Sequence, residues 1–173
     1  MKVQRFGFVL ILMAFGLAMT SLAQTVKTDY DRNTNFNRYK TYSWNKVEVK
    51  NALWIDRIKN AVNIELVKKG WAQVATGGDV SIGAVGITRD HATLETAYNG
   101  MDGFRWDGFG HDYVLEQQSE GTLAVSIFDN DTRKLVWVGT SINAVSDKSK
   151  KNIKNLNKGV EEMFEHFPPE AKS

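Results

Sequence analysis

Two stretches of the chain place apolar side chains three or four residues apart, which is the spacing of one face of an α-helix. The first covers residues 51–69 and is followed by Gly70, a residue type that favours helix C-termini. The second follows Ser146 or Asp147 as N-cap and is stopped by the two prolines at 168–169. The sequence therefore predicts two amphipathic helices. Their apolar positions are Leu53, Ile55, Ile58, Val62, Leu66 and Val67 in the first helix and Ile153, Leu156, Val160, Met163, Phe164 and Phe167 in the second.

Four shorter segments have the alternating or β-branched composition of strands. They cover residues 26–30, 39–44, 71–74 and 79–88, and the pair Gly77-Gly78 separates the last two. The first helix lies between the second and third of these segments, so this half of the chain is predicted to have the order β-β-α-β-β.

A β-hairpin is predicted farther along the chain. Residues 121–128 alternate apolar with small polar side chains, residues 129–132 have the composition of a turn, and residues 135–144 form a second apolar run. Because each helix has one apolar face, the simplest arrangement packs both helices on one sheet. We therefore predict an α+β fold, an antiparallel or mixed β-sheet with two amphipathic helices packed on it, in the order β-β-α-β-β-β-β-α.

The N-terminus has the pattern of a secretory signal peptide. Lys2 and Arg5 precede an apolar run over residues 6–19, which is shorter than the roughly 20 residues of a membrane span. Small side chains then suit cleavage between Ala23 and Gln24. An uncleaved anchor would require a longer apolar run or basic residues directly after it. We therefore expect the signal peptide to be removed and the protein to be periplasmic or secreted.

Removal of residues 1–23 leaves residues 24–173, a length that typically forms a single domain. The sequence contains no cysteine, which argues against a lipid anchor, disulfides and cysteine-based metal sites. Lys2 and Arg5 leave with the signal peptide, so 20 of the 22 Lys and Arg side chains remain against 20 Asp and Glu. Without a positive surplus, nucleic acid is not an expected partner.

Several segments, in this order, resemble the bacterial DUF4136 family, whose domain has no known function. They are residues 29–31 (DYD), 36–44 (FNRYKTYSW), 121–123 (GTL), 134–139 (KLVWVG) and 167–169 (FPP). The resemblance spans nearly the whole mature chain and implies an exported cell-envelope protein, with no catalytic residues to carry over. Family members often look like lipoproteins, and the missing cysteine here favours a soluble form.

The segment 98–113 fits no packing template, because four glycines are interleaved with aromatic side chains. One interpretation is a surface connection whose rings fold back on the sheet. The other is a binding loop whose rings stack on a sugar or contact an apolar partner, with Asp102, Arg105, Asp107 and Asp112 as a polar rim. The candidate binding residues are Tyr98, Phe104, Trp106, Phe109, His111 and Tyr113.

A divalent-metal site is the alternative hypothesis, and it would make the protein a metal-dependent hydrolase. Asp90, His91, His111 and Asp112 would form it if the intervening segment folds back on itself. The short ligand spacing H-E-x-x-H, the phosphate-binding loop and the nucleophile elbow are all missing from the sequence. We therefore expect no cofactor. We favour a non-catalytic module whose sheet edge or segment 98–113 contacts an envelope protein or glycan, and we leave its oligomeric state open.

Overall fold

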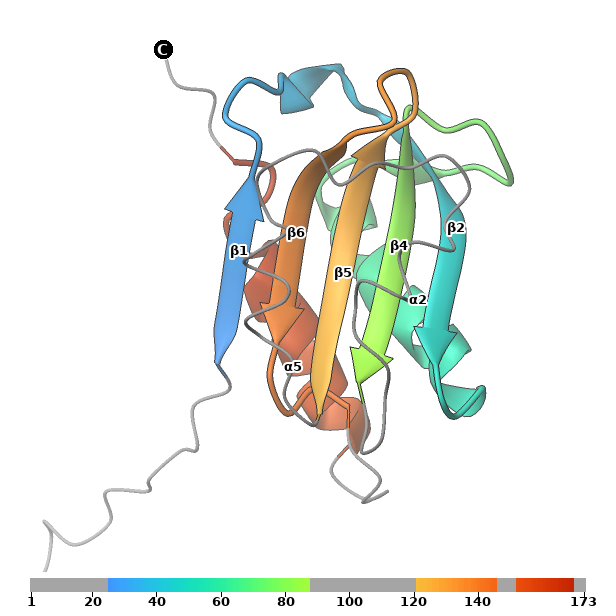
Figure 1. Cartoon of the computed structure of the whole chain (residues 1–173), viewed down its shortest axis with the longest axis vertical. Coiled ribbons are helices and arrows are strands. Elements are labelled where there is room, and N and C mark those ends of the chain that lie inside the picture. The colour runs from blue at the N-terminus through green and yellow to red at the C-terminus, as the bar shows by residue number, and fades with distance from the viewer. Residues whose placement is uncertain (1–24, 88–120, 146–151, 170–173) are drawn as a thin grey trace, which may run out of the picture.

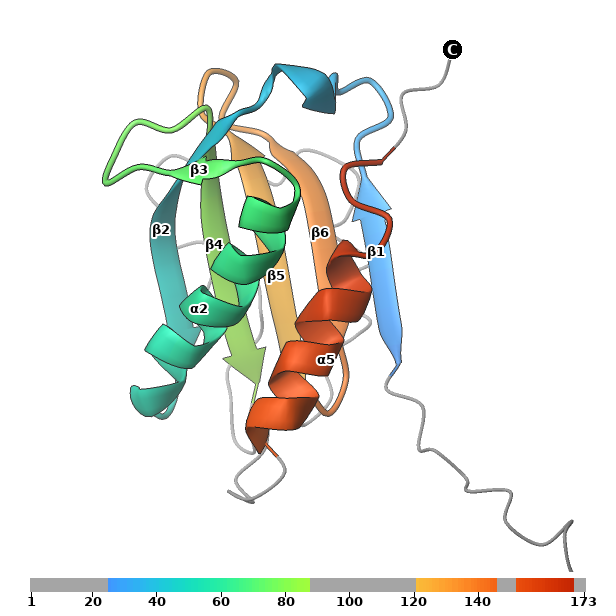
Figure 2. The same cartoon turned by 180° about the vertical axis from the view of Figure 1, so that it is seen from behind.

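One mixed sheet of six strands carries two helices on one of its faces (Figures 1 and 2). The computed structural model describes residues 25–87, 121–145 and 152–169. The predicted α+β class and the order β-β-α-β-β-β-β-α are confirmed. The elements are β1 (Val26–Tyr30), the short 3-10 helix η1 (Phe36–Arg38), β2 (Thr41–Val49), α2 (Leu53–Lys68), β3 (Ala72–Gln73), β4 (Val80–Ile87), β5 (Thr122–Asp129), β6 (Leu135–Ser141) and α5 (Asn152–Phe164).

The strands lie in the order β1-β6-β5-β4-β2-β3. Strand β2 runs parallel to both of its neighbours, and every other neighbouring pair is antiparallel. The first strand of the chain therefore pairs with the last one, with Val26 opposite Ser141 and Tyr30 opposite Trp137. Since no described strand lies beyond β1, this strand forms one edge of the sheet (Figure 1).

Helix α2 confirms the helix predicted over residues 51–69, but it buries a different set of side chains. Leu53 and Val67 belong to the predicted apolar positions, yet they are 69% and 61% exposed. The predicted positions were therefore spread over more than one face of the helix, and only part of them contacts the sheet. The buried residues of α2 are Trp54, Ile58, Ala61, Val62, Glu65 and Leu66.

The C-terminus of α2 explains why the chain has glycine at position 70. Gly70 adopts a φ of 82°, in the left-handed region that residues with a β-carbon resist. This turn lets the N–H of Gly70 bond to the carbonyl of Val67 (2.9 Å) and the N–H of Trp71 bond to the carbonyl of Leu66 (3.0 Å). The pair of bonds is a Schellman motif, which satisfies the last carbonyls of the helix and directs Trp71 back into the core.

Strand β2 extends beyond the predicted segment 39–44. The prediction stopped short because a bulge shifts the alternation of its side chains between the two faces of the sheet. Trp44 lies opposite Ile82 of β4 and Val47 lies opposite Ala84, so β2 advances three residues while β4 advances two. The apolar side chains on the two sides of the bulge are thus three residues apart although both pack against the core. The alternation that marks a strand is interrupted at this point.

Helix α5 ends at Phe164, three residues before the last apolar position of the predicted helix. Phe167 is nevertheless 2% exposed, because the segment after the helix turns back over the sheet. A proline disfavours helical conformation in the residue before it, which keeps Phe167 out of the helix. The terminal aromatic ring therefore reaches the core from a turn.

Candidate functional site

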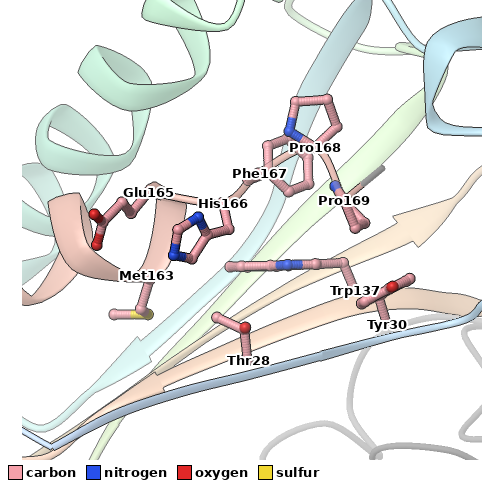
Figure 3. Close-up of a pocket in the computed structure, with 9 residues that line it drawn as sticks. All are labelled: Thr28, Tyr30, Trp137, Met163, Glu165, His166, Phe167, Pro168 and Pro169. Carbon is pink, nitrogen blue, oxygen red and sulfur yellow. The ribbon is translucent and has the colours of Figure 1, made fainter. Parts of the chain in front are cut away.

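A pocket of about 440 Å³ opens between the edge strand β1 and the C-terminal end of α5 (Figure 3). We call it the edge pocket. Strand β1 supplies Thr28 and Tyr30, β6 supplies Trp137, and α5 supplies Met163. The other lining residues belong to the segment after α5 and are Glu165, His166, Phe167, Pro168 and Pro169.

The floor of the edge pocket is aromatic and rigidly packed. Trp137 and Phe167 are each 2% exposed, and Met163 is 1% exposed. Gly139 follows Trp137 on the same face of β6, and a β-carbon there would lie 2.5 Å from Cη2 of Trp137 and 3.0 Å from Sδ of Met163. The indole of Trp137 therefore occupies space that a side chain at position 139 would fill.

Phe167 fixes the floor to the rest of the core through ring contacts. Its ring centroid lies 5.3 Å from that of Trp137, 5.3 Å from that of Phe164, 5.2 Å from that of Trp71 and 5.9 Å from that of Phe36. The interplanar angles of these four pairs lie between 71° and 81°, an edge-to-face geometry that aromatic pairs favour. These ring contacts hold the C-terminal segment in place in the absence of a ligand.

The rim of the edge pocket carries polar groups. Thr28, Glu165 and His166 are exposed and Tyr30 is half-buried. The backbone of this rim is anchored, because Nζ of Lys69 at the end of α2 donates to the carbonyl oxygen of Glu165 (3.3 Å). Within residues 25–87, 121–145 and 152–169, no side chain bonds to the imidazole of His166 or to the hydroxyl of Tyr30. Among the described residues, nothing therefore competes with a ligand for these two groups.

This arrangement is suited to binding. Ligand sites commonly combine an apolar, aromatic lining with a few polar groups that orient the ligand. In the described part of the chain, no group of three or more His, Asp and Glu side chains is placed to hold a metal ion.

A second polar site, the Asp129 cluster of Arg38, Tyr39 and Asp129, lies at the end of β5. The hydroxyl of Tyr39 donates to Oδ2 of Asp129 (2.6 Å), and the guanidinium of Arg38 pairs with the same oxygen. The other oxygen, Oδ1, accepts the backbone N–H groups of Asp131 and Thr132, both at 2.8 Å. The carboxylate thus ties the β5–β6 turn to the end of η1 and to the residue that follows it.

Burial, charge and hydrogen bonding shift the pKa values of Asp129 and Tyr39 in opposite directions. Burial alone would raise the pKa of Asp129, but the Tyr39 hydroxyl, the Thr132 N–H and the Arg38 charge outweigh it and hold that pKa below its usual range. Burial, together with the bond to Asp129, raises the pKa of Tyr39. Asp129 is therefore ionised and Tyr39 neutral at neutral pH, as their hydrogen bond requires.

The family model of DUF4136, a domain of unknown function, matches residues 26–169. This range begins with β1 and ends with the last lining residue of the edge pocket. The chain belongs to the DUF4136 family. The resemblance drawn from the sequence motifs is confirmed. Both chain segments that line the edge pocket, β1 and the residues after α5, lie within the family domain.

A solved structure shares the fold of this DUF4136 domain. A PDZ domain protein from Parabacteroides distasonis matches with a TM-score of 0.55 and 15% identity, covering 86% of this chain and 37% of that chain. The chain thus spans little more than a third of that protein, and the likeness concerns the fold alone. Two PelC dodecamer structures from Paraburkholderia phytofirmans match with TM-scores of 0.41 and 0.43 at 9% and 8% identity, each covering 80% of this chain and 95% of that chain. No functionally curated protein matches.

The site residues predicted from the sequence lie outside the residues that the structure describes. This holds for the signal cleavage site at Ala23 and Gln24 and for the whole segment 98–113. No helix in the described ranges is long and apolar enough to cross a membrane. The candidate residues concerned are Tyr98, Phe104, Trp106, Phe109, His111 and Tyr113 for binding, and Asp90, His91, His111 and Asp112 for a metal.

Sequence reasoning did not find the edge pocket of this DUF4136 domain, although two signals were present. The predicted strand over residues 26–30 is confirmed as β1, and strand geometry puts Thr28 and Tyr30 on one face of it. The family motif at 167–169 marked the C-terminal segment. Neither signal predicts that the two segments meet, because this depends on the pairing of β1 with β6.

Proposed function

We propose that this DUF4136 protein is an exported cell-envelope protein that acts as a non-catalytic binding module. In this proposal the edge pocket receives an apolar or aromatic side chain of a partner protein. The observation that carries it is the buried floor of Trp137, Met163 and Phe167 beneath the polar groups of Tyr30 and His166. Deep aromatic anchors surrounded by a polar rim are typical of protein-recognition sites.

The export part of the proposal is supported by the sequence of the first 23 residues, which has the basic start, apolar run and small residues of a signal peptide. The absence of cysteine argues for a form without a lipid anchor. Segment 98–113 with Trp106 and Phe109 is a second candidate contact surface, supported by its glycine and aromatic composition.

The proposal favours a protein partner over a glycan. A sugar presents hydroxyl groups around each ring and requires a comparable number of polar partners. Four side chains of the edge pocket can bond to a ligand, Thr28, Tyr30, Glu165 and His166, and Pro168 and Pro169 add apolar surface beside them. An apolar side chain flanked by backbone amides fits this distribution better.

A titration followed by NMR tests the proposal. N-acetylphenylalaninamide serves as the peptide probe and an N-acetylglucosamine–N-acetylmuramic acid disaccharide as the glycan probe. We expect the peptide probe to shift the indole N–H signal of Trp137. The indole N–H of Trp44 donates to Oδ1 of Asn63 (2.9 Å) outside the pocket and serves as the internal control. Two variants, Tyr30→Phe and His166→Ala, each remove one polar group of the rim. Each should weaken probe binding by about two- to tenfold.

The titration has clear contrary outcomes. If only the disaccharide shifts the Trp137 signal, the ligand of the edge pocket is a glycan and the proposed protein partner is wrong. Equal shifts of Trp44 and Trp137, or no shift with either probe, would remove the edge pocket as the binding site of this module.

A further inference from the structure

The outer side of β1 presents backbone groups that pair with no described strand. The N–H of Asp31 bonds to the carbonyl of Val136 (2.9 Å), and the N–H of Ile142 bonds to the carbonyl of Thr25 (3.0 Å). In an antiparallel pair the residues that bond to the neighbour alternate along the strand. The backbone N–H and C=O groups of residues 25, 27, 29 and 31 therefore point toward β6. Those of Val26, Thr28 and Tyr30 point the other way, out from the edge of the sheet. No described strand pairs with this edge.

The sequence of β1, Val-Lys-Thr-Asp-Tyr, is complementary to itself when it runs in opposite directions. If Thr28 lies opposite Thr28 of a second copy, Lys27 lies opposite Asp29 and Val26 lies opposite Tyr30. These are an opposite-charge pair, an aromatic pair with a β-branched residue, and a threonine pair, which are three of the favourable cross-strand combinations. By symmetry, each of the unlike pairs occurs twice.

The charges also select one register. Backbone pairing requires that the outward-facing residues 26, 28 and 30 meet each other, so the strands can slip only in steps that keep this match. The next antiparallel register in one direction places Lys27 opposite Lys27. The next in the other direction places Asp29 opposite Asp29 within the strand, and its only opposite-charge pairs join Lys27 to Asp31, beyond the end of β1. A parallel pairing also brings like charges together. Like charges directly opposite each other are destabilising.

We propose that two copies of this chain associate through their β1 strands, antiparallel and centred on Thr28, to form one continuous sheet across a two-fold axis. The margin of the sheet at β1 is visible in Figure 1, and Figure 2 shows both helices on one face of the sheet, with α5 next to β6 and β1. Directly opposed residues share a face of the sheet. Val26 of the second copy would therefore lie beside Tyr30 and extend the wall of the edge pocket.

One of the outward N–H groups of β1 already has a hydrogen-bond partner within its own chain, and this bond is compatible with the pairing. The backbone N–H of Tyr30 donates to Oδ1 of its neighbour Asp29 (2.9 Å), so it is already satisfied. The pairing then uses the N–H and C=O of Thr28, together with the N–H of Val26 and the C=O of Tyr30 from each copy. Oδ2 of Asp29 remains for the ammonium of Lys27 on the second copy.

A contact of five residues per strand is small compared with the interfaces of permanent dimers. We therefore expect a weak dimer whose population depends on protein concentration. The charged pairs of the dimer, Lys27 with Asp29, lie on the face of β1 that points away from the edge pocket, so they form without any ligand in the pocket.

Sedimentation velocity of protein expressed from the full-length gene tests the proposal. The wild-type protein should shift from monomer to dimer as its concentration rises to the millimolar range. Lys27→Asp and Asp29→Lys should each remain monomeric, because each brings like charges together. An equimolar mixture of these two variants restores both opposite-charge pairs. The mixture should dimerise at least about tenfold more tightly than either variant alone.

The doubly swapped variant K27D/D29K is the matched control, because it keeps the composition and should dimerise with itself. Thr28→Pro supplies a second test, since it removes an outward N–H without removing a bond to β6, and it should abolish the dimer. Thermal unfolding verifies that each variant is folded. A wild-type protein that stays monomeric, or a mixture no tighter than its components, would overturn the proposal. The NMR titration of the edge pocket on the monomeric K27D variant shows separately whether the proposed function holds.

Discussion

The Asp129 cluster and the edge pocket both combine aromatic rings with charged or polar side chains, but they differ in how their polar atoms are satisfied. Both carboxylate oxygens of Asp129 accept hydrogen bonds, from Tyr39 on one side and from backbone N–H groups on the other. At the edge pocket only the floor is packed, while His166 has no described partner. A polar group satisfied inside the chain holds the fold, whereas one that faces solvent above an aromatic floor is available for recognition.

The largest effect should follow from breaking the Asp129 cluster. Asp129→Ala leaves the Tyr39 hydroxyl and two backbone N–H groups without their acceptor, and we expect it to lower the free energy of unfolding by about 2–4 kcal/mol. Urea denaturation measures this change. Asp131→Asn is the matched control, because Asp131 is 87% exposed and lies 3.7 Å from the guanidinium of Arg38; it should change stability by less than about 0.5 kcal/mol. Equal effects of the two variants would contradict the structural role of Asp129.

A smaller effect should follow from acid. The backbone N–H groups of Lys40 and Thr41 hold the pKa of Asp79 below its usual range, and the pKa of Asp129 is also lowered. Carboxylates with depressed pKa values in the folded state stabilise the protein fully above the unfolded-state value of about 3.9. That stability is lost as the pH falls through the folded-state pKa values. The urea midpoint should therefore decrease below about pH 4.

The variant Asp129→Asn sharpens this prediction. It removes one of the two titrating groups, so the midpoint of the variant should depend less steeply on pH than that of the wild-type protein. A wild-type midpoint that rises on acidification, or a slope unchanged by the substitution, would show that these carboxylates do not govern acid stability.

The smallest effect on stability should come from the rim of the edge pocket. Tyr30→Phe removes only a hydroxyl, and His166→Ala truncates an exposed side chain. We expect both to change the free energy of unfolding by less than about 0.5 kcal/mol. The same variants should weaken the peptide probe, so thermal unfolding and the NMR titration together separate the two regions. If a rim variant unfolds the protein, the rim side chains stabilise the fold, as the Asp129 cluster does, and are not reserved for recognition.

The elements that were predictable from the sequence are those with an uninterrupted local pattern. Strand β1, helix α2 and the β5–β6 hairpin follow from alternation, helical spacing and turn composition. Prediction failed where a local pattern was broken or shared between faces. The bulge between Trp44 and Val47 hid the second half of β2, and Leu53 and Val67 were assigned to a face that they do not occupy.

The candidate site was less predictable than the fold, because it is assembled from distant segments. Tyr30 and Trp137 face each other only because the first strand pairs with the last, and no local spacing records that pairing. Phe167 reaches the floor from a turn, so the helical pattern placed it in the wrong element. The sequence predicted an exposed sheet edge as one contact surface, but it could not predict the pocket beside that edge.

The pairing of β1 with β6 has a consequence for how the chain reaches its native state. Strand β1 gains its partner only after the residues up to Ser141 have been synthesised, and the core closes only when Phe167 is present. Contacts between segments so far apart in the sequence slow folding, because the intervening chain must be ordered before they form. A nascent chain of this topology therefore completes its fold only when nearly its full length is available. The proposed export benefits from that delay, since the leading strand would cross the membrane while the strand that completes it is still to come.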